Sequence, residues 1–350
     1  MSIDVLQSKI RKLKTPIVVG LDPTPELIPP ELLADCKARL GPGPEAAAES
    51  YTLFCKGLLD GLKKAVPAVK VQAACFEALG WQGVKAMQEV LAYAKKLNYY
   101  VILETMRSDV GHIAELTADA VFGGLDFGGD RVFPYPCDAL ILNGYLGSDG
   151  VKPFLPYLSG PEAKNIFIVV KSSNKSSPEV QDLLSGDRVI YTAMADLTLR
   201  WSTDLFGKCG YGEVGAVVGL SSPRAIQALR KRYDTLFFLV PGYGAQGGVA
   251  KHAAYAFDRF GHGAAVCVSR SVIGAWREHP STAALTAAVP LLEDASCAST
   301  AAATAMKSTT APRAVVPCEQ GRSSGVDWPE AALAAVEKTK RQLETYITVL

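Results

Sequence analysis

Short runs of apolar, often β-branched residues recur along the chain, and stretches with helical spacing separate them. Within each run the hydrophobicity is continuous rather than alternating, as required of strands that are buried on both faces of a parallel sheet. The pattern therefore predicts repeated strand–helix units. The runs lie at residues 16–22, 69–72, 99–104, 137–143, 165–171, 214–219, 235–240 and 264–269.

The intervals between these runs favour helices. Residues 81–97 and 222–233 repeat apolar positions with a helical period, and residues 1–14 form an amphipathic, charged segment. Eight strand–helix units fit a closed barrel better than an open doubly wound sheet, which usually has fewer strands. We therefore predict an α/β protein with a single (β/α)8 TIM-barrel domain formed by residues 1–280.

The pattern breaks at residues 281–327, which are rich in Ala, Thr and Ser and poor in aromatic residues. We expect a flexible, low-complexity insertion here. A short helical hairpin is the alternative, because alanine favours helix. Residues 328–350 are expected to form a C-terminal helix that packs back on the barrel.

Composition narrows the functional classes. The 350 residues are 49% hydrophobic and 20% charged, with a formal net charge of +1, which argues against nucleic acid as a partner. Eight cysteines occur singly, as in a reduced cytoplasmic protein, and four histidines lack ligand spacing, so no metal site is expected. We expect no membrane segment and no signal peptide, because no run approaches about 20 apolar residues.

Polar residues follow most of the predicted strands. In barrels of this kind the chemistry lies at the carboxyl ends of the strands, so these residues are expected to surround one site. Any one of them could be an ordinary loop residue, but together they indicate a pocket. They are Asp22, Lys70, Gln72, Glu104, Asp109, Asn143, Ser172–Asn174, Gly219–Ser221, Gly242–Gly248 and Ser269–Arg270.

The segment PGYGAQGG at 241–248 is the sharpest of these signals. Closely spaced glycines let backbone N–H groups approach an anion, and loops after the seventh and eighth strands of barrels often hold phosphate. Arg270, after the eighth run, could add a charge-assisted contact. The sequence therefore predicts a phosphate site. The alternative is a flexible glycine turn beside a surface arginine.

Lys70 interrupts an otherwise apolar strand. An isolated lysine in such a place could lie along the surface with its ammonium in water. Glu104 and Asp109, one strand further along, could keep it charged and positioned. We expect a cluster of one cation and two carboxylates at the barrel mouth.

Eight collinear blocks resemble orotidine 5'-phosphate decarboxylase of the bacterial type. The resemblance covers residues 1–278 and the last helix, and it implies a barrel that binds a pyrimidine nucleoside monophosphate without metal or organic cofactor. It also implies a homodimer in which the Asp109 region reaches the partner's site. The blocks are GLDPTPELIPP, VKVQAACFEALG, ILETMRSDVGHIA, NGYLGSDGVKPFL, VVKSSNKSS, VGAVVGLSSP, FFLVPGYGAQGG and VSRSVIGAW.

The resemblance assigns roles to individual residues. Asp22 would hold the ribose hydroxyls, and Ser173 would meet the edge of the pyrimidine. Gln246, the backbone of Gly247–Gly248 and Arg270 would hold the 5'-phosphate. Asn143 is counted with the substrate-binding residues because it ends a predicted strand.

The catalytic array of the family departs from its pattern here. The family has a Lys-Asp-Lys-Asp array, in which Lys70 matches the first lysine and the rest is written D-x-K-x-x-D. This chain has Glu104 and Asp109 at the carboxylates, and Met106 replaces the lysine that protonates C6 of the base. A thioether cannot donate a proton, and a general acid typically contributes ~10²–10⁴-fold.

Further departures lie nearby. His112 and Ile113 replace residues of an I-G-S-T segment, Gly144 replaces a proline, and Lys175 replaces the proline of S-N-P. Lys175 and His112 are candidates for a relocated proton donor.

Three hypotheses follow. The chain could decarboxylate orotidine 5'-phosphate or a relative weakly or with altered chemistry. It could carry out a different reaction on a pyrimidine nucleotide in specialised nucleoside metabolism. It could also be a non-catalytic UMP-binding paralogue.

Overall fold

The computed structural model describes residues 1–278 and 327–349. Apart from Asp327, the insertion expected at 281–327 lies outside the described residues. The division of the chain into domains at 280 and 327 therefore stays a prediction.

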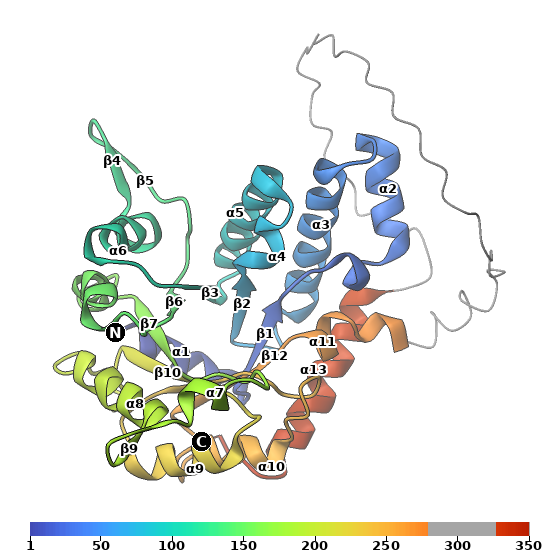
Figure 1. Cartoon of the computed structure of the whole chain (residues 1–350). Coiled ribbons are helices and arrows are strands. Elements are labelled where there is room, and N and C mark those ends of the chain that lie inside the picture. The colour runs from blue at the N-terminus through green and yellow to red at the C-terminus, as the bar shows by residue number, and fades with distance from the viewer. Residues whose placement is uncertain (279–326, 350) are drawn as a thin grey trace. The chain divides into compact units, whose positions relative to one another are not determined.

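Eight parallel strands close into a barrel, in the order β1-β12-β11-β10-β7-β6-β3-β2 (Figure 1). Each of the eight apolar runs overlaps one of these strands, so the predicted (β/α)8 TIM barrel is confirmed. The run at 235–240 contributes only its last three residues, whereas the third strand continues beyond its run. The strands are β1 Ile17–Leu21, β2 Ala68–Gln72, β3 Tyr100–Arg107, β6 Ala139–Leu142, β7 Asn165–Lys171, β10 Val214–Val218, β11 Phe238–Val240 and β12 Ala264–Val268.

Helices fill the intervals between strands, including those expected from the helical spacing of 1–14, 81–97 and 222–233. Several short ones follow strand ends directly. The helices are α1 Ser2–Leu13, α2 Pro30–Leu40, α3 Pro44–Leu62, α4 Ala73–Glu77, α5 Gly80–Lys96, α6 Gly111–Ala118, α7 Pro178–Gln181, α8 Ile190–Trp201, α9 Pro223–Arg232, α10 Ala250–Ala253, α11 Arg270–Ile273 and α13 Trp328–Glu344.

Two antiparallel hairpins add to the barrel, and the sequence pattern did not indicate either. The first joins β4 (Leu125–Phe127) to β5 (Asp130–Val132), and the second joins β8 (Leu184–Ser185) to β9 (Arg188–Val189). Both are short and mostly exposed, so they lack the buried run that marks a strand in a sequence. Figure 1 shows the first hairpin beside α6, away from the strands of the barrel.

Helix α13 packs against α3. Its first residue, Trp328, lies with its ring 6.3 Å from the ring of Phe54. Gly57 of α3 permits this approach, because a Cβ there would lie 2.9 Å from Trp328 Nε1. Asp327 caps the helix by accepting a hydrogen bond of 3.0 Å from Glu330 N.

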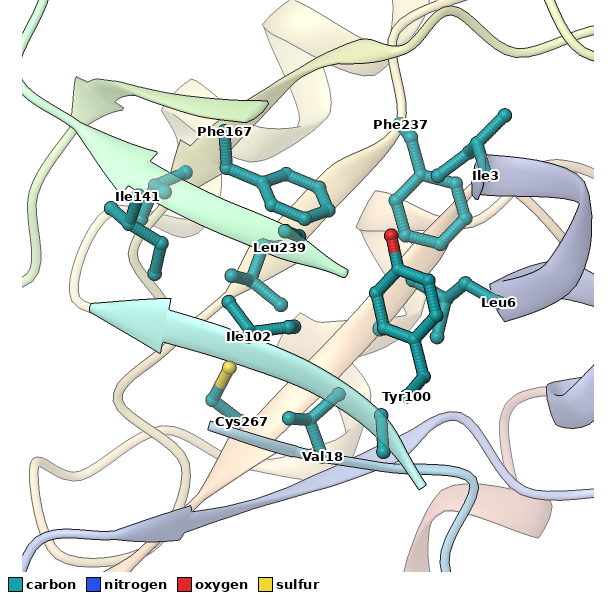
Figure 2. Close-up of a cluster of buried hydrophobic side chains, with 14 of the residues drawn as sticks. Ile3, Leu6, Val18, Tyr100, Ile102, Ile141, Phe167, Phe237, Leu239 and Cys267 are labelled. Carbon is teal, nitrogen blue, oxygen red and sulfur yellow. The ribbon is translucent and has the colours of Figure 1, made fainter. Parts of the chain in front are cut away.

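The amino-terminal helix closes one end of the barrel. Ile3 and Leu6 of α1 are fully buried and join a core that includes Tyr100, Phe167 and Phe237 from the strands or their approaches (Figure 2). Tyr100 and Phe237 lie where strands begin, so the helix covers the amino ends of the strands. The carboxyl ends of the strands, which α1 does not cover, are left open for a binding site.

A buried carboxylic acid fixes the start of this helix. Glu213 is 0% exposed and accepts hydrogen bonds of 3.1 Å from Ile3 N and of 3.3 Å from Asn165 Nδ2. Burial raises the pKa of Glu213 to about 7, despite those donors. The attachment of α1 is therefore strongest when Glu213 carries a proton.

Stability should fall with rising pH because of this residue. Between its ordinary pKa of 4.5 and its folded value of about 7, Glu213 binds a proton in the folded state and not in the unfolded one. We expect Glu213→Gln to flatten the fall in Tm from pH 5 to pH 8, removing a dependence on the order of 2 kcal/mol. Thermal melts across that range measure this. Glu89→Gln, at an exposed position, is the control, and equal slopes in Glu213→Gln and wild type would contradict the assignment.

Candidate active site

Lys70 lies between two carboxylates at the mouth of the barrel. Its Nζ is 2.9 Å from Asp22 Oδ1 and also pairs with Glu104 Oε2. The lysine and Glu104 are buried, at 5% and 7% exposed. Burial alone would lower the pKa of Lys70, but the charges of Asp22 and Glu104 outweigh it and raise the pKa above its ordinary value. The group is therefore held as an ammonium ion.

Strand register brings these three side chains together. Gly20 of β1 pairs with Lys70 of β2, which in turn pairs with Ile102 of β3. Asp22 and Glu104 come two residues after Gly20 and Ile102, so they point to the same face as those residues. That face is the barrel interior, because Ile102 belongs to the core.

Within this chain the ion pairs of Lys70 are with Asp22 and Glu104, and Asp109 forms none with it. Asp22 supplies the second carboxylate in its place. Asp109 is exposed, and its Oδ1 accepts a hydrogen bond of 2.8 Å from Val110 N. It lies beyond the end of β3, where the chain has left the barrel wall.

A bulge in β3 separates Glu104 from the residues that follow. Glu104 pairs with Ile141 and Arg107 with the next residue of β6, so Thr105 and Met106 have no counterpart. Met106 adopts a left-handed conformation with φ 49° and is 44% exposed. A residue other than glycine rarely adopts this conformation, and such outliers cluster at functional sites.

The bulge is held by a pair that the sequence did not indicate. Arg107 forms an ion pair with Glu77, the last residue of α4. Its carbonyl accepts a hydrogen bond of 3.2 Å from Asn143 N. The Asn143 side chain is also engaged, since its Oδ1 accepts a bond of 3.0 Å from Tyr145 N. Asn143 therefore shapes the turn after β6.

The glycine loop after β11 lies beside Ser173. A Cβ built on Gly242 would be 3.0 Å from Gln246 Oε1 and 3.4 Å from Ser173 Cβ, so both predicted residues border the same glycine. Gly242 and Gly247 have φ of 102° and 84°, which only glycine adopts readily. The loop therefore needs glycine at these positions.

Arg270 lies between this loop and the lysine cluster. A Cβ on Gly244 would be 3.2 Å from Ser271 Oγ, and a Cβ on Gly20 would overlap Ser269 Oγ and lie 3.2 Å from Asp22 Oδ1. Arg270, between the two serines, is exposed. Its side chain forms no hydrogen bond or ion pair with the described part of the chain. The structure thus brings Asp22 and its lysine next to the start of α11 and the glycine loop.

The two candidate replacement acids are placed differently. Lys175 and His112 are both exposed. Across residues 1–278 and 327–349, neither side chain forms a hydrogen bond or ion pair.

The described residues offer no arrangement for a metal ion and no membrane span. Six free cysteines are found there, and no group of three or more His, Cys, Asp or Glu is arranged to hold a metal ion. Within the same residues, no helix has the length and apolar character needed to cross a membrane.

The amino-acid sequence is similar to those of known proteins. A family model described as "Orotidine 5'-phosphate decarboxylase / HUMPS family" matches residues 15–286. The chain belongs to this family. An orotidine 5'-phosphate decarboxylase of Rhodopirellula baltica is 37% identical over 280 residues, which covers 80% of this chain and 90% of that protein.

Solved structures in the same family agree. An orotidine-monophosphate-decarboxylase structure from Toxoplasma gondii matches with a TM-score of 0.65 at 27% identity, covering 82% of this chain and 93% of that one. A Leishmania donovani UMP synthase matches with a TM-score of 0.63 at 29% identity, over 81% of this chain. The present chain covers 54% of the length of that UMP synthase.

Removing the ammonium should destabilise the barrel strongly. Lys70→Met leaves the Asp22 and Glu104 carboxylates without their shared cation, and breaking a buried pair in this way typically costs about 3–5 kcal/mol. Denaturant unfolding at pH 7 measures the loss. Lys56→Met is the matched control, because Lys56 pairs with Glu89 near the surface and should contribute about 0–1 kcal/mol. Equal losses in both variants would contradict the buried pairing.

Proposed function

We propose that the barrel mouth binds a pyrimidine nucleoside monophosphate, and that the chain is a carbon–carbon lyase with weak or altered decarboxylation of orotidine 5'-phosphate. The observation that carries this proposal is the buried ammonium of Lys70 between two carboxylates, beside an exposed arginine and a glycine loop. The relatives named orotidine 5'-phosphate decarboxylase support it.

The phosphate would bind between Arg270 and the glycine loop. Within the described residues Arg270 has no partner to release, so its guanidinium is available for a charge-assisted contact. Backbone N–H groups of Gly247 and Gly248 and the amide of Gln246 would supply further donors. With the phosphate there, Ser173 would meet the base, and Asp22 would meet the ribose.

Lys70 would act on the base through its charge. Loss of carbon dioxide from orotidine 5'-phosphate leaves an electron pair at C6, and a fixed ammonium stabilises it in a site with little water. A lysine whose pKa is raised holds its proton firmly, so Lys70 is a poor acid for C6. The carbanion must therefore obtain its proton from another group.

The group that would give a proton to C6 is missing at its expected position. Met106 cannot donate a proton, and Lys175 and His112 are exposed and form no ion pair with the Lys70 cluster in the described residues. Protonation of C6 would depend on solvent or on a side chain that moves. This dependence is the physical reason for the slow or altered turnover in the proposal.

We also propose a homodimer in which the Asp109 region reaches the partner's site. Asp109 is exposed at the edge of the mouth, and Val110, Ile113 and Leu116 beside it are 52%, 36% and 56% exposed. Apolar side chains gathered at one edge favour contact with a second chain. Light scattering should give a mass of about twice 37.2 kDa, and a monomer at micromolar concentration would overturn the dimer.

Placing a lysine at position 106 tests whether a missing proton donor limits decarboxylation. Wild type should bind UMP and release little carbon dioxide from orotidine 5'-phosphate. Met106→Lys should raise the rate of release by ~10²–10⁴-fold, because it returns a general acid to the bulge. Thr105→Lys places the same charge one residue away in the same bulge and should give no such gain.

The outcomes separate the hypotheses. Rapid release by wild type would overturn the assignment of weak decarboxylation. Tight UMP binding with no release from either chain would favour a different reaction or a binding role. Absence of UMP binding would overturn the nucleotide site itself.

A further inference from the structure

An open cleft of about 700 Å³ lies outside the barrel mouth, among β7, α8, α9 and α10. Its lining includes Ser221, which follows β10, but none of the mouth residues Asp22, Lys70, Glu104, Gln246 and Arg270. The volume falls within the range of about 300–1,000 Å³ typical of small-molecule sites. The cleft is therefore large enough for a ligand of its own.

A second bulge turns a lysine into this cleft. Strand β7 has one residue more than β10 between its paired positions Val169 and Lys171. Val169 packs against the barrel core, whereas Lys171 lines the cleft. The bulge thus breaks the alternation that would otherwise return Lys171 to the mouth. Lys171 is 1% exposed, and its Nζ lies 2.7 Å from Asp182 Oδ1.

The cleft has more positive than negative groups. Asp182 is its single lining carboxylate, and that group is already paired with Lys171. Arg224 and His252 also line it, and in the described part of the chain their side chains form no hydrogen bond or ion pair. An anion entering the cleft would therefore meet a free guanidinium and an imidazole.

Aromatic rings and the first turn of a helix complete the lining. Tyr191 lies with its ring centroid 5.7 Å from Lys171 Nζ, and Tyr255 stacks on His252 with centroids 6.2 Å apart. Ser222 precedes α9, and its side chain does not cap the helix. Pro223 begins α9 and has no N–H, so the N–H groups of Arg224 and Ala225 are those available to the same anion as the Arg224 side chain.

We propose that this cleft binds a small organic phosphate with a flat ring, separately from the nucleotide at the mouth. Arg224, His252 and the first turn of α9 hold the phosphate. The ring lies against Tyr191 and Tyr255. Neither Lys70 nor Arg270 takes part.

Phenyl phosphate is a suitable probe, and it is titrated calorimetrically into the full chain carrying Arg270→Ala. This substitution weakens phosphate binding at the barrel mouth. Binding should persist in that chain, and adding Arg224→Ala with His252→Ala should weaken it by roughly tenfold or more, as expected for charged hydrogen bonds. Arg232→Ala is the matched control, because Arg232 lies on the same helix but pairs with Asp196. Inorganic phosphate should bind more weakly than phenyl phosphate, because it lacks the ring.

Absence of phenyl phosphate binding, or equal binding with and without Arg224 and His252, would overturn the cleft site. Inorganic phosphate that binds as tightly as phenyl phosphate would contradict the ring contact. UMP titrated into wild type and Arg270→Ala reports on the mouth independently. An unchanged UMP affinity in Arg270→Ala, with cleft binding intact, would count against the proposed function alone.

Discussion

The ion cluster of Lys70, Asp22 and Glu104 is the interaction on which the mouth of the barrel depends. A buried ammonium is unfavourable unless carboxylates surround it, and the buried Glu104 and the partly exposed Asp22 repel each other without the ammonium. Three neighbouring strands each contribute one of these groups, so their register must be maintained for the cluster to exist. The same register places Gly20 against Ser269 and hence fixes where Arg270 begins its helix.

Two bulges decide where the remaining polar groups point. In β3 the bulge at Thr105 and Met106 carries the chain out of the wall, so that Asp109 reaches the surface. In β7 the bulge moves Lys171 to the outer cleft. The β7 bulge thus moves Lys171, which alternation would return to the mouth, to another surface. The barrel thus carries one group of cationic side chains at its mouth, Lys70 and Arg270, and another at the outer cleft, Lys171 and Arg224.

The sequence predicted the barrel well, because continuous apolar runs are a direct consequence of burial on both faces. It also predicted that Lys70 and Glu104 would meet, since they lie on neighbouring strands. It did not predict the pairing of Asp22 with Lys70, because hydrophobic spacing does not reveal which polar side chains meet. The pair between Arg107 and Glu77 was missed for the same reason.

Helix α1 at the amino end of the barrel affects how reaction products can leave the interior. Ile3 and Leu6 seal the amino ends of the strands, so the interior around Lys70 opens only at the carboxyl ends. A nucleotide seated there would sit above any small fragment formed beside the ammonium. Such a fragment would have to pass the bound ring or wait for its departure, which makes the order of product release a property of the amino-terminal helix.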